Sequence, residues 1–134
     1  MPVEKVCPYV MRGAGHGAEV LVFSHPLAGI QLVKGTLEPG ECVEAGALRE
    51  LAEESGLTGS VVADGWSSPD ITDGQIWHFV PVAVPSPSDR FVHFCADDGG
   101  HRFAFFWWPL GKMPGPEWHE IFARALGEIR ARHQ

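Results

Sequence analysis

From Gly35 to Leu57 the chain reads GTLEPGECVEAGALRELAEESGL, and this stretch contains the signals for a turn followed by a helix. Pro39 and Gly40 suit the two central positions of a type II turn. Residues 43–55 contain no proline and many good helix formers, and Gly56 after them is a typical helix stop. The pattern therefore predicts a turn around Pro39 and a helix from Val43 to Ser55.

The expected helix carries apolar residues on one side and carboxylates on another. On a helical wheel the side expected to face the core holds Ala45, Leu48, Leu51 and Ala52. Glu50, Glu53 and Glu54 stand at positions i, i+3 and i+4, so we expect them to project together, opposite the apolar side. Gly46, four residues before Glu50, is expected to leave open space above these carboxylates.

Three neighbouring carboxylates repel one another, so a stable fold favours a cation among them. Oxygen-only ligands select a hard divalent ion. Mg²⁺ is the natural candidate, because it binds through a few carboxylates and shares its other positions with phosphates, and Mn²⁺ is a possible substitute. The alternative interpretation is a solvated helix face, which is common for glutamate-rich stretches.

The composition limits the kind of protein and its partners. The chain has 134 residues, 45% hydrophobic and 20% charged, as expected for one globular domain spanning residues 1–134. Ten Lys and Arg against 17 Asp and Glu give a net charge of −7, which argues against stable DNA binding and against binding to an anionic membrane. The three cysteines form no CxxC pair, and we find no signal sequence or membrane-spanning stretch, so a reducing, cytoplasmic location is expected.

Residues outside this stretch predict strands, a hairpin and a closing helix. Apolar, β-branched and aromatic runs predict strands at residues 7–11, 19–24, 30–33, 60–63 and 76–84. Pro81 is expected to break the last strand or to mark a sheet edge, and residues 66–74 are expected to form a surface loop. Strands at 91–96 and 102–108 predict a hairpin. A helix from Glu117 to Arg132, with Pro116 in its first turn, completes an expected α/β/α layering.

Gly35 is followed at fixed spacing by Glu41, Arg49-Glu50-Leu51, Glu53-Glu54 and Gly56-Leu57. This arrangement resembles the signature of the Nudix hydrolases, G-x5-E-x7-R-E-U-x-E-E-x-G-U with U a bulky aliphatic residue, and agrees with it at every fixed position. The resemblance implies a Nudix-type α/β/α sandwich with a mixed β-sheet between helices. It also implies divalent-cation-dependent hydrolysis of the pyrophosphate linkage in a nucleoside diphosphate joined to another moiety.

The resemblance further implies roles for the residues of the motif. The metal would be held by Glu50, Glu53, Glu54 and the backbone carbonyl near Gly35. Glu50 would alternatively be the base that accepts a proton from the attacking water. Arg49 would orient the carboxylates through a salt bridge, with Glu41 as its partner or as an additional outer ligand. Metal ions suit this chemistry because they neutralise phosphate oxygens that otherwise repel the attacking water.

Several family members supply another carboxylate from outside the motif, and three residues are candidates for it here. Asp97 and Asp98 fall in the expected hairpin turn, where aspartate is also explained by turn chemistry alone. Glu117 is likewise explained by the preference for acids in the first turn of a helix.

Substrate-binding candidates outside the helix are Lys34, Trp77, His78 and His93. The lysine precedes Gly35 as it does in the diadenosine polyphosphate hydrolases of the family. The two histidines lie in expected strands and would serve as phosphate donors or proton shuttles, although a lone strand histidine is more often structural. Aromatic rings such as that of Trp77 offer a nucleobase a stacking surface. Alternation along a strand allows one of Trp107 and Trp108 to face the core and the other the cleft.

A compact substrate suits a short chain, so we favour a nucleoside triphosphate over a diadenosine polyphosphate, ADP-ribose, a nucleotide sugar or capped RNA. A second hypothesis is a catalytically silent Nudix module that binds a nucleotide, but no residue of the motif is missing. A third is a structural domain with an acidic helix, which leaves the fixed spacing unexplained. An exposed aromatic strand also leads us to expect a homodimer.

Overall fold

A computed structural model describes residues 1–133 of the chain, except for the side chain of Asp98. One half of its sheet is built on two long strands, β1 (Val3–Arg12) and β7 (Gln75–Ala83). They run parallel, from Val3 opposite Gln75 to Val10 opposite Val82. Three short strands pair antiparallel with their outer edges: β4 (Gly35–Thr36) with β1, and β5 (Ser60–Val61) and β6 (Trp66–Ser68) with β7. The expected loop at 66–74 therefore begins with a strand.

Pro81 does not break β7, contrary to one of the two expectations for it. On the outer edge of β7, Val82 pairs with Val61 of β5 and Phe79 pairs with Trp66 of β6. Pro81 lies between these two pairs, opposite the connection from β5 to β6. The carbonyl of Pro81 accepts a hydrogen bond from Val62 N (3.1 Å). The missing N–H of the proline thus falls between two short ladders on the outer edge, where a strand tolerates it.

The other half of the sheet is antiparallel. Strand β2 (Glu19–His25) pairs with β9 (His101–Pro109), from Glu19 opposite Pro109 to Ser24 opposite Ala104. Strand β3 (Gly29–Gln31) folds back on β2, and β8 (Phe91–Cys95) covers the far side of β9. The hairpin expected at 91–108 is confirmed, with the short 3₁₀ helix η2 (Asp97–Gly99) as its connection.

The two halves meet along a very short ladder. Strands β1 and β2 pair only at Met11–Val20 and Arg12–Glu19, beside the 3₁₀ helix η1 (Gly15–Gly17) that connects them. Apart from these two residue pairs, β1 pairs with β7 and β4, whereas β2 pairs with β9 and β3. The sheet is therefore joined at one end and unpaired at the other, and the candidate site lies at the unpaired end.

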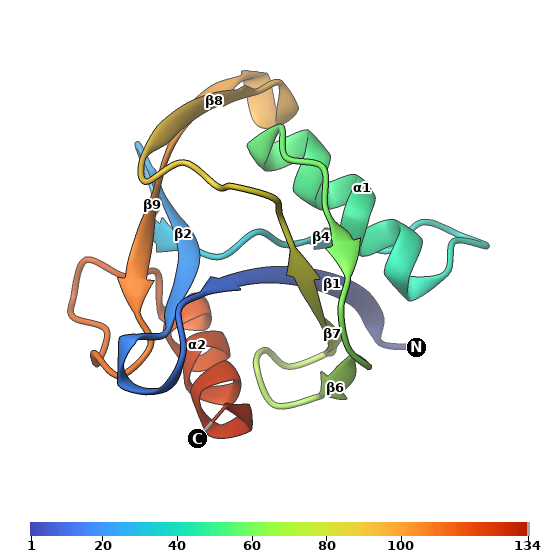
Figure 1. Cartoon of the computed structure of the whole chain (residues 1–134). Coiled ribbons are helices and arrows are strands. Elements are labelled where there is room, and N and C mark those ends of the chain that lie inside the picture. The colour runs from blue at the N-terminus through green and yellow to red at the C-terminus, as the bar shows by residue number, and fades with distance from the viewer. Residues whose placement is uncertain (134) are drawn as a thin grey trace.

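Two helices cover opposite faces of these strands (Figure 1). Helix α1 (Val43–Ser55) has the predicted bounds and ends at Gly56, whose φ of 75° places it in the left-handed region favoured by glycine. It buries Ala47 and Leu51 against one face of the sheet, and α2 (Glu120–Arg132) buries Phe122, Leu126 and Ile129 against the other. This arrangement confirms the expected α/β/α sandwich with a mixed sheet between helices.

Strand alternation divides the aromatic residues between the two faces. Trp77, Phe79 and Trp108 belong to the α2 side, and Phe103, Phe105 and Trp107 belong to the α1 side. Trp107 and Trp108 are both buried on opposite faces, so neither faces a cleft and that expectation is wrong. No helix in the described part of the chain is long and apolar enough to span a membrane.

Two further sequence expectations about the helices are wrong. Ala45 and Ala52 are exposed, because α1 is rotated so that Ala47, Leu51 and also Glu50 face inward. The closing helix begins at Glu120 rather than at 117. The carbonyl of Glu117 accepts a hydrogen bond from Ile30 N, which ties this segment to β3 and keeps it out of the helix.

Candidate active site

The inward rotation of α1 brings Glu50 against β4. Only 7% of Glu50 is exposed, so the three glutamates do not all lie opposite the apolar side as expected. Its carboxylate occupies the space beside Gly35, where the Cβ of any other residue would overlap it. Gly46 does not leave open space: a Cβ there would lie 2.8 Å from both Leu37 Cδ1 and Glu41 Oε1. Both glycines allow side chains of the site to approach the backbone closely.

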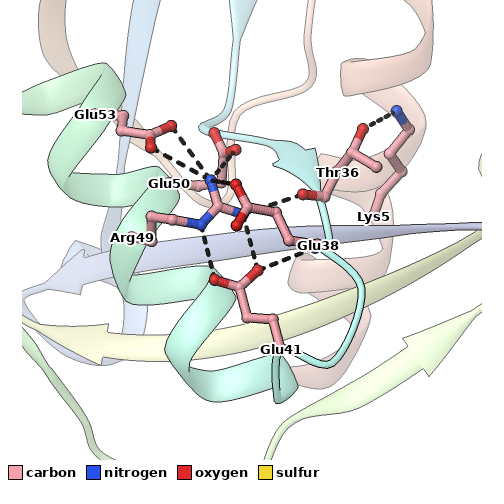
Figure 2. Close-up of polar contacts among 7 residues, drawn as sticks. All are labelled: Lys5, Thr36, Glu38, Glu41, Arg49, Glu50 and Glu53. Atoms are coloured by element: carbon pink, nitrogen blue, oxygen red, sulfur yellow. Dashed lines mark hydrogen bonds and ion pairs between the residues drawn. The ribbon is translucent and has the colours of Figure 1, made fainter.

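Arg49 gathers the carboxylates around one guanidinium (Figure 2). Its Nε and Nη2 donate to the two oxygens of Glu41 (2.8 and 2.9 Å), and Nη2 also donates to the carbonyl of Thr36 (3.1 Å). Its Nη1 donates to Glu50 Oε1 (2.9 Å) and lies 3.3 Å from Glu53 Oε2. The guanidinium therefore links the turn before α1 to two glutamates of the helix.

Glu41 is the partner of Arg49. Hydrogen bonds from Arg49, followed by one from Glu38 N, lower the pKa of Glu41 to about 2. Both carboxylate oxygens are engaged by these donors. This geometry agrees with the salt-bridge role implied for Arg49 and leaves Glu41 little capacity to act as an additional outer ligand.

Glu50 and Glu54 form a covered carboxyl pair on α1. Burial, and next the charge of Glu50, raise the pKa of Glu54 to about 9, although Lys34 N donates a hydrogen bond to its carboxyl group. Burial also raises the pKa of Glu50, against the opposing effect of Arg49. Glu53 is more exposed, with 46% of its side chain accessible. The surroundings of Glu50 and Glu54 therefore disfavour the ionised form of both carboxyl groups.

The donor chemistry of this pair fits a divalent cation. Glutamate oxygens are the ligands that Mg²⁺ and Mn²⁺ prefer, and a cation would offset the burial and repulsion that raise both pKa values. Among the side chains that the structure describes, which exclude those of Asp98 and Gln134, no three His, Cys, Asp or Glu side chains already converge as a complete metal site. The carboxylate of Glu53 is held near Arg49, with 3.3 Å between Glu53 Oε2 and Arg49 Nη1. The fit therefore rests on the covered Glu50 and Glu54 beside the backbone at Gly35, with Glu53 as a third carboxylate held nearby by Arg49.

Lys34 lies next to this carboxyl pair. Its Nζ is 5.6 Å from the ring centres of both Trp77 and Phe122. Burial, and next the charge of Lys5, lower the pKa of Lys34, while Glu54 acts in the opposite direction. Trp77 is completely buried and its Nε1 donates to Gln75 Oε1 (2.8 Å). The expectation that Trp77 stacks on a substrate is therefore wrong, because its ring belongs to the core.

Neither of the two candidate histidines lines the cavity of about 300 Å³ that opens beside Glu54. His93 Nε2 is 3.2 Å from the carbonyl of Glu53, so this ring contacts the end of α1. His78 Nε2 is 2.9 Å from Glu4 Oε1 and lines a different cavity with Glu44 and Asp64. The two cavities share no lining residue. The structure thus does not bring His78 into the candidate site and gives His93 a contact with the helix backbone.

A cavity of about 300 Å³ opens beside Glu54 and Lys34 at the unpaired end of the sheet. Asp97 lines it, whereas Glu117 does not. Phe103, an aromatic residue that sequence reasoning offered as a possible stacking surface, also lines it, whereas sequence reasoning missed the polar lining residues His25, Gln31 and His101. The pairing of β2 with β9 brings His25 and His101 together, the pairing of β3 with β2 adds Gln31, and no local motif signals the first of these pairings.

Comparison with known proteins agrees with this geometry. Residues 3–126 match the model of the NUDIX domain. No curated protein matches the chain. Among solved structures, an ADP-ribose pyrophosphatase from Streptococcus suis is similar with a TM-score of 0.67 and 12% identity, over 98% of this chain and 92% of that one. A MutT NUDIX hydrolase from Burkholderia pseudomallei has a TM-score of 0.59 and 20% identity, over 96% and 98%.

A C. elegans Ap4A hydrolase is also similar, with a TM-score of 0.55 and 17% identity, over 82% of each chain. Identities this low establish a shared fold only. The family match, in contrast, covers nearly the whole chain, including the turn at Gly35, all of α1 and the strands on both sides of the cavity. The chain therefore belongs to the NUDIX domain family.

Proposed function

We propose that this protein is a divalent-cation-dependent hydrolase that cleaves the pyrophosphate linkage of a nucleoside diphosphate joined to another moiety. The observation that carries the proposal is the covered Glu50–Glu54 pair beside Gly35, next to an open cavity. Membership of the family supports hydrolysis of pyrophosphate bonds, and Nudix hydrolases generally use divalent cations. The residues that would hold Mg²⁺ or Mn²⁺ are Glu50, Glu53, Glu54 and the carbonyl of Gly35.

Bound metal would neutralise phosphate oxygens and lower the pKa of a bound water. Arg49 holds Glu50 by a direct hydrogen bond and keeps Glu53 on the same side of α1, so it acts as a positioning residue. Glu50 would help to hold the metal or would accept the proton of the attacking water. Lys34 is the cation beside the carboxyl pair that would contact the phosphates of a substrate.

The favoured substrate is a nucleoside triphosphate. A cavity of about 300 Å³ lies at the lower end of the volumes of small-molecule sites, which suits one nucleoside better than two. The structural neighbours include an ADP-ribose pyrophosphatase and an Ap4A hydrolase, so ADP-ribose and diadenosine polyphosphates belong in the same test, together with nucleotide sugars.

The test is release of phosphate and pyrophosphate from a panel of these compounds, with Mg²⁺ and separately with Mn²⁺. We expect turnover of one substrate class that a chelator abolishes. No turnover of any compound, together with ligand-induced thermal stabilisation, would overturn the hydrolase proposal in favour of a silent nucleotide-binding module.

A further inference from the structure

The last turn of α1 lies beside the hairpin formed by β8 and β9 (Figure 1). This turn carries Glu53 and Glu54, whereas Leu51, the last buried apolar residue of the helix, precedes it. The buried apolar contacts made by α1 therefore end before these two carboxyl groups. The position of the last turn depends on other contacts.

One carbonyl in this turn lacks the backbone donor that a continuing helix would supply. The N–H of Gly56 donates to Ala52 O (2.9 Å), which is the last bond of the helical series. The next N–H, that of Leu57, donates to Ser55 Oγ (3.1 Å) instead of to Glu53 O. Carbonyls at a helix end stay unsatisfied unless a side chain or water bonds to them. The carbonyl of Glu53 is therefore open to a donor from outside the helix.

His93 of β8 supplies this donor. Its Nε2 lies 3.2 Å from Glu53 O, and because a carbonyl oxygen only accepts, the proton of the bond belongs to Nε2. The ring also packs directly on Gly56, where an added Cβ would lie 2.8 Å from His93 Nδ1. Within the described part of the chain, the bond from His93 to Glu53 O is the one hydrogen bond between α1 and the β8–β9 hairpin.

The hairpin that carries His93 also forms the opposite wall of the cavity beside Glu54. His93 pairs with Phe103 of β9, and Cys95 lies two residues further along β8. Phe103, Cys95 and Asp97 line the cavity together with Glu54. A shift of the last turn of α1 relative to β8 would therefore change the distance between the carboxyl groups of α1 and this wall.

We infer that His93 is a positioning residue, which holds the carboxyl groups of Glu53 and Glu54 in place for a divalent cation by donating a hydrogen bond to Glu53 O. This inference deepens the proposed function and rests on it for the identity of the cation. The imidazole acts through the helix backbone and does not line the cavity. This role differs from the phosphate donor or proton shuttle expected from the sequence.

The experiment uses the full chain without substrate and has two readouts. Amide hydrogen exchange, measured by NMR, reports opening at Gly56, whose N–H makes the last backbone bond of α1. Calorimetric titration reports the affinity for Mn²⁺. The variants are His93→Ala, His93→Gln, which keeps a donor, and His93→Phe, which keeps a ring beside Gly56 without a donor. His16→Ala is the matched control, because His16 is exposed in η1 at the paired end of the sheet.

We expect His93→Ala and His93→Phe to accelerate exchange at Gly56 and to weaken Mn²⁺ binding, each by about three- to ten-fold, the size of one hydrogen bond. His93→Gln should stay within about two-fold of the parent chain in both readouts, because its amide donates a comparable hydrogen bond. The amides of the buried strand β2 should exchange as in the parent in every variant. His16→Ala should match the parent chain throughout.

Parent-like exchange at Gly56 and parent-like Mn²⁺ affinity in both His93→Ala and His93→Phe would overturn the inference. Parent-like behaviour of His93→Phe alone would also overturn it, because packing of the ring would then be sufficient. Equal acceleration of exchange at Gly56 and throughout β2 would overturn it as well, because such a result reports general destabilisation.

The two proposals fail separately. Faster exchange at Gly56 and weaker Mn²⁺ binding, both corrected by His93→Gln, in a protein that hydrolyses no compound of the panel, would support the role of His93 and contradict the hydrolase. Metal-dependent hydrolysis with parent-like Mn²⁺ affinity in His93→Ala would do the reverse.

Discussion

Replacing Glu54 by glutamine removes a carboxyl group whose charge the fold disfavours, without changing the shape of the side chain. The amide can still accept the hydrogen bond from Lys34 N and can donate to Glu50. In the metal-free protein the pKa of Glu54 is raised from 4.5 to about 9, first by burial and then by Glu50. At pH 7 the native carboxyl group is therefore protonated, whereas the same group in the unfolded chain is ionised.

The size of the effect follows from this difference. Each pKa unit corresponds to about 1.4 kcal/mol, so protonation of Glu54 on folding costs about 3 kcal/mol at pH 7. Because the native pKa is the higher one, stability is complete below about pH 4.5 and is lost as the pH rises toward 9. For a chain of this length, about 3 kcal/mol corresponds to a change of about 10 °C in Tm.

The assay is thermal denaturation of metal-free parent, Glu54→Gln and Glu44→Gln proteins between pH 4 and pH 9. Glu44 is the matched control, because it is an exposed glutamate in the first turn of the same helix. We expect Glu54→Gln to be more stable than the parent at pH 7, with a gain that shrinks toward pH 4.5. Added Mg²⁺ should raise the Tm of the parent more than that of Glu54→Gln. A metal-free Glu54→Gln protein with the Tm and pH slope of the parent would refute the reasoning.

Three substitutions test other contacts of the site. Gly35→Ala places a Cβ where the Glu50 carboxylate lies, so we expect the free energy of unfolding, measured by thermal denaturation, to fall by about 1–3 kcal/mol. Gly111→Ala is the control, because the space around Gly111 is open. Arg49→Lys cannot keep the paired bonds to Glu41 together with the bond to Glu50, so kcat should fall at least about ten-fold; a normal kcat would contradict the positioning role. Trp77→Ala should destabilise the fold by about 3–5 kcal/mol in chemical denaturation because the ring is buried, and a Trp77→Phe variant that keeps its stability but raises KM would contradict the assignment of Trp77 to the core.

Local signals in the sequence were sufficient to predict α1 and its motif. Val43–Ser55 has the predicted bounds because Gly56 ends the helix by its own backbone conformation, whatever the helix packs against. The resemblance to the Nudix signature implied Glu41 either as the partner of Arg49 or as an outer ligand, and the contacts between the two side chains select the first of these roles.

The rotation of α1 was not predictable from the helix alone. A helical wheel counts Glu50 as a surface residue, but Gly35 leaves a space on β4 into which its carboxylate fits. The same limit applies to the cavity. His25 and His101 are far apart in sequence, and only the long-range pairing of β2 with β9 makes them neighbours. Trp77 was misassigned because a strand aromatic carries no local mark of the face on which it is buried.

The central claim is that metal-dependent hydrolysis occurs at the glutamates of α1. The most direct test compares the initial rates of the parent chain, Glu53→Gln and Glu44→Gln on the preferred compound of the panel at saturating Mg²⁺. Both residues lie on α1, but Glu53 is beside Arg49 and the carboxyl pair, whereas Glu44 belongs to the exposed first turn. The account predicts a sharp loss of turnover in Glu53→Gln, with an unchanged circular-dichroism spectrum, and parent-like turnover in Glu44→Gln. Equal turnover in all three proteins would contradict it.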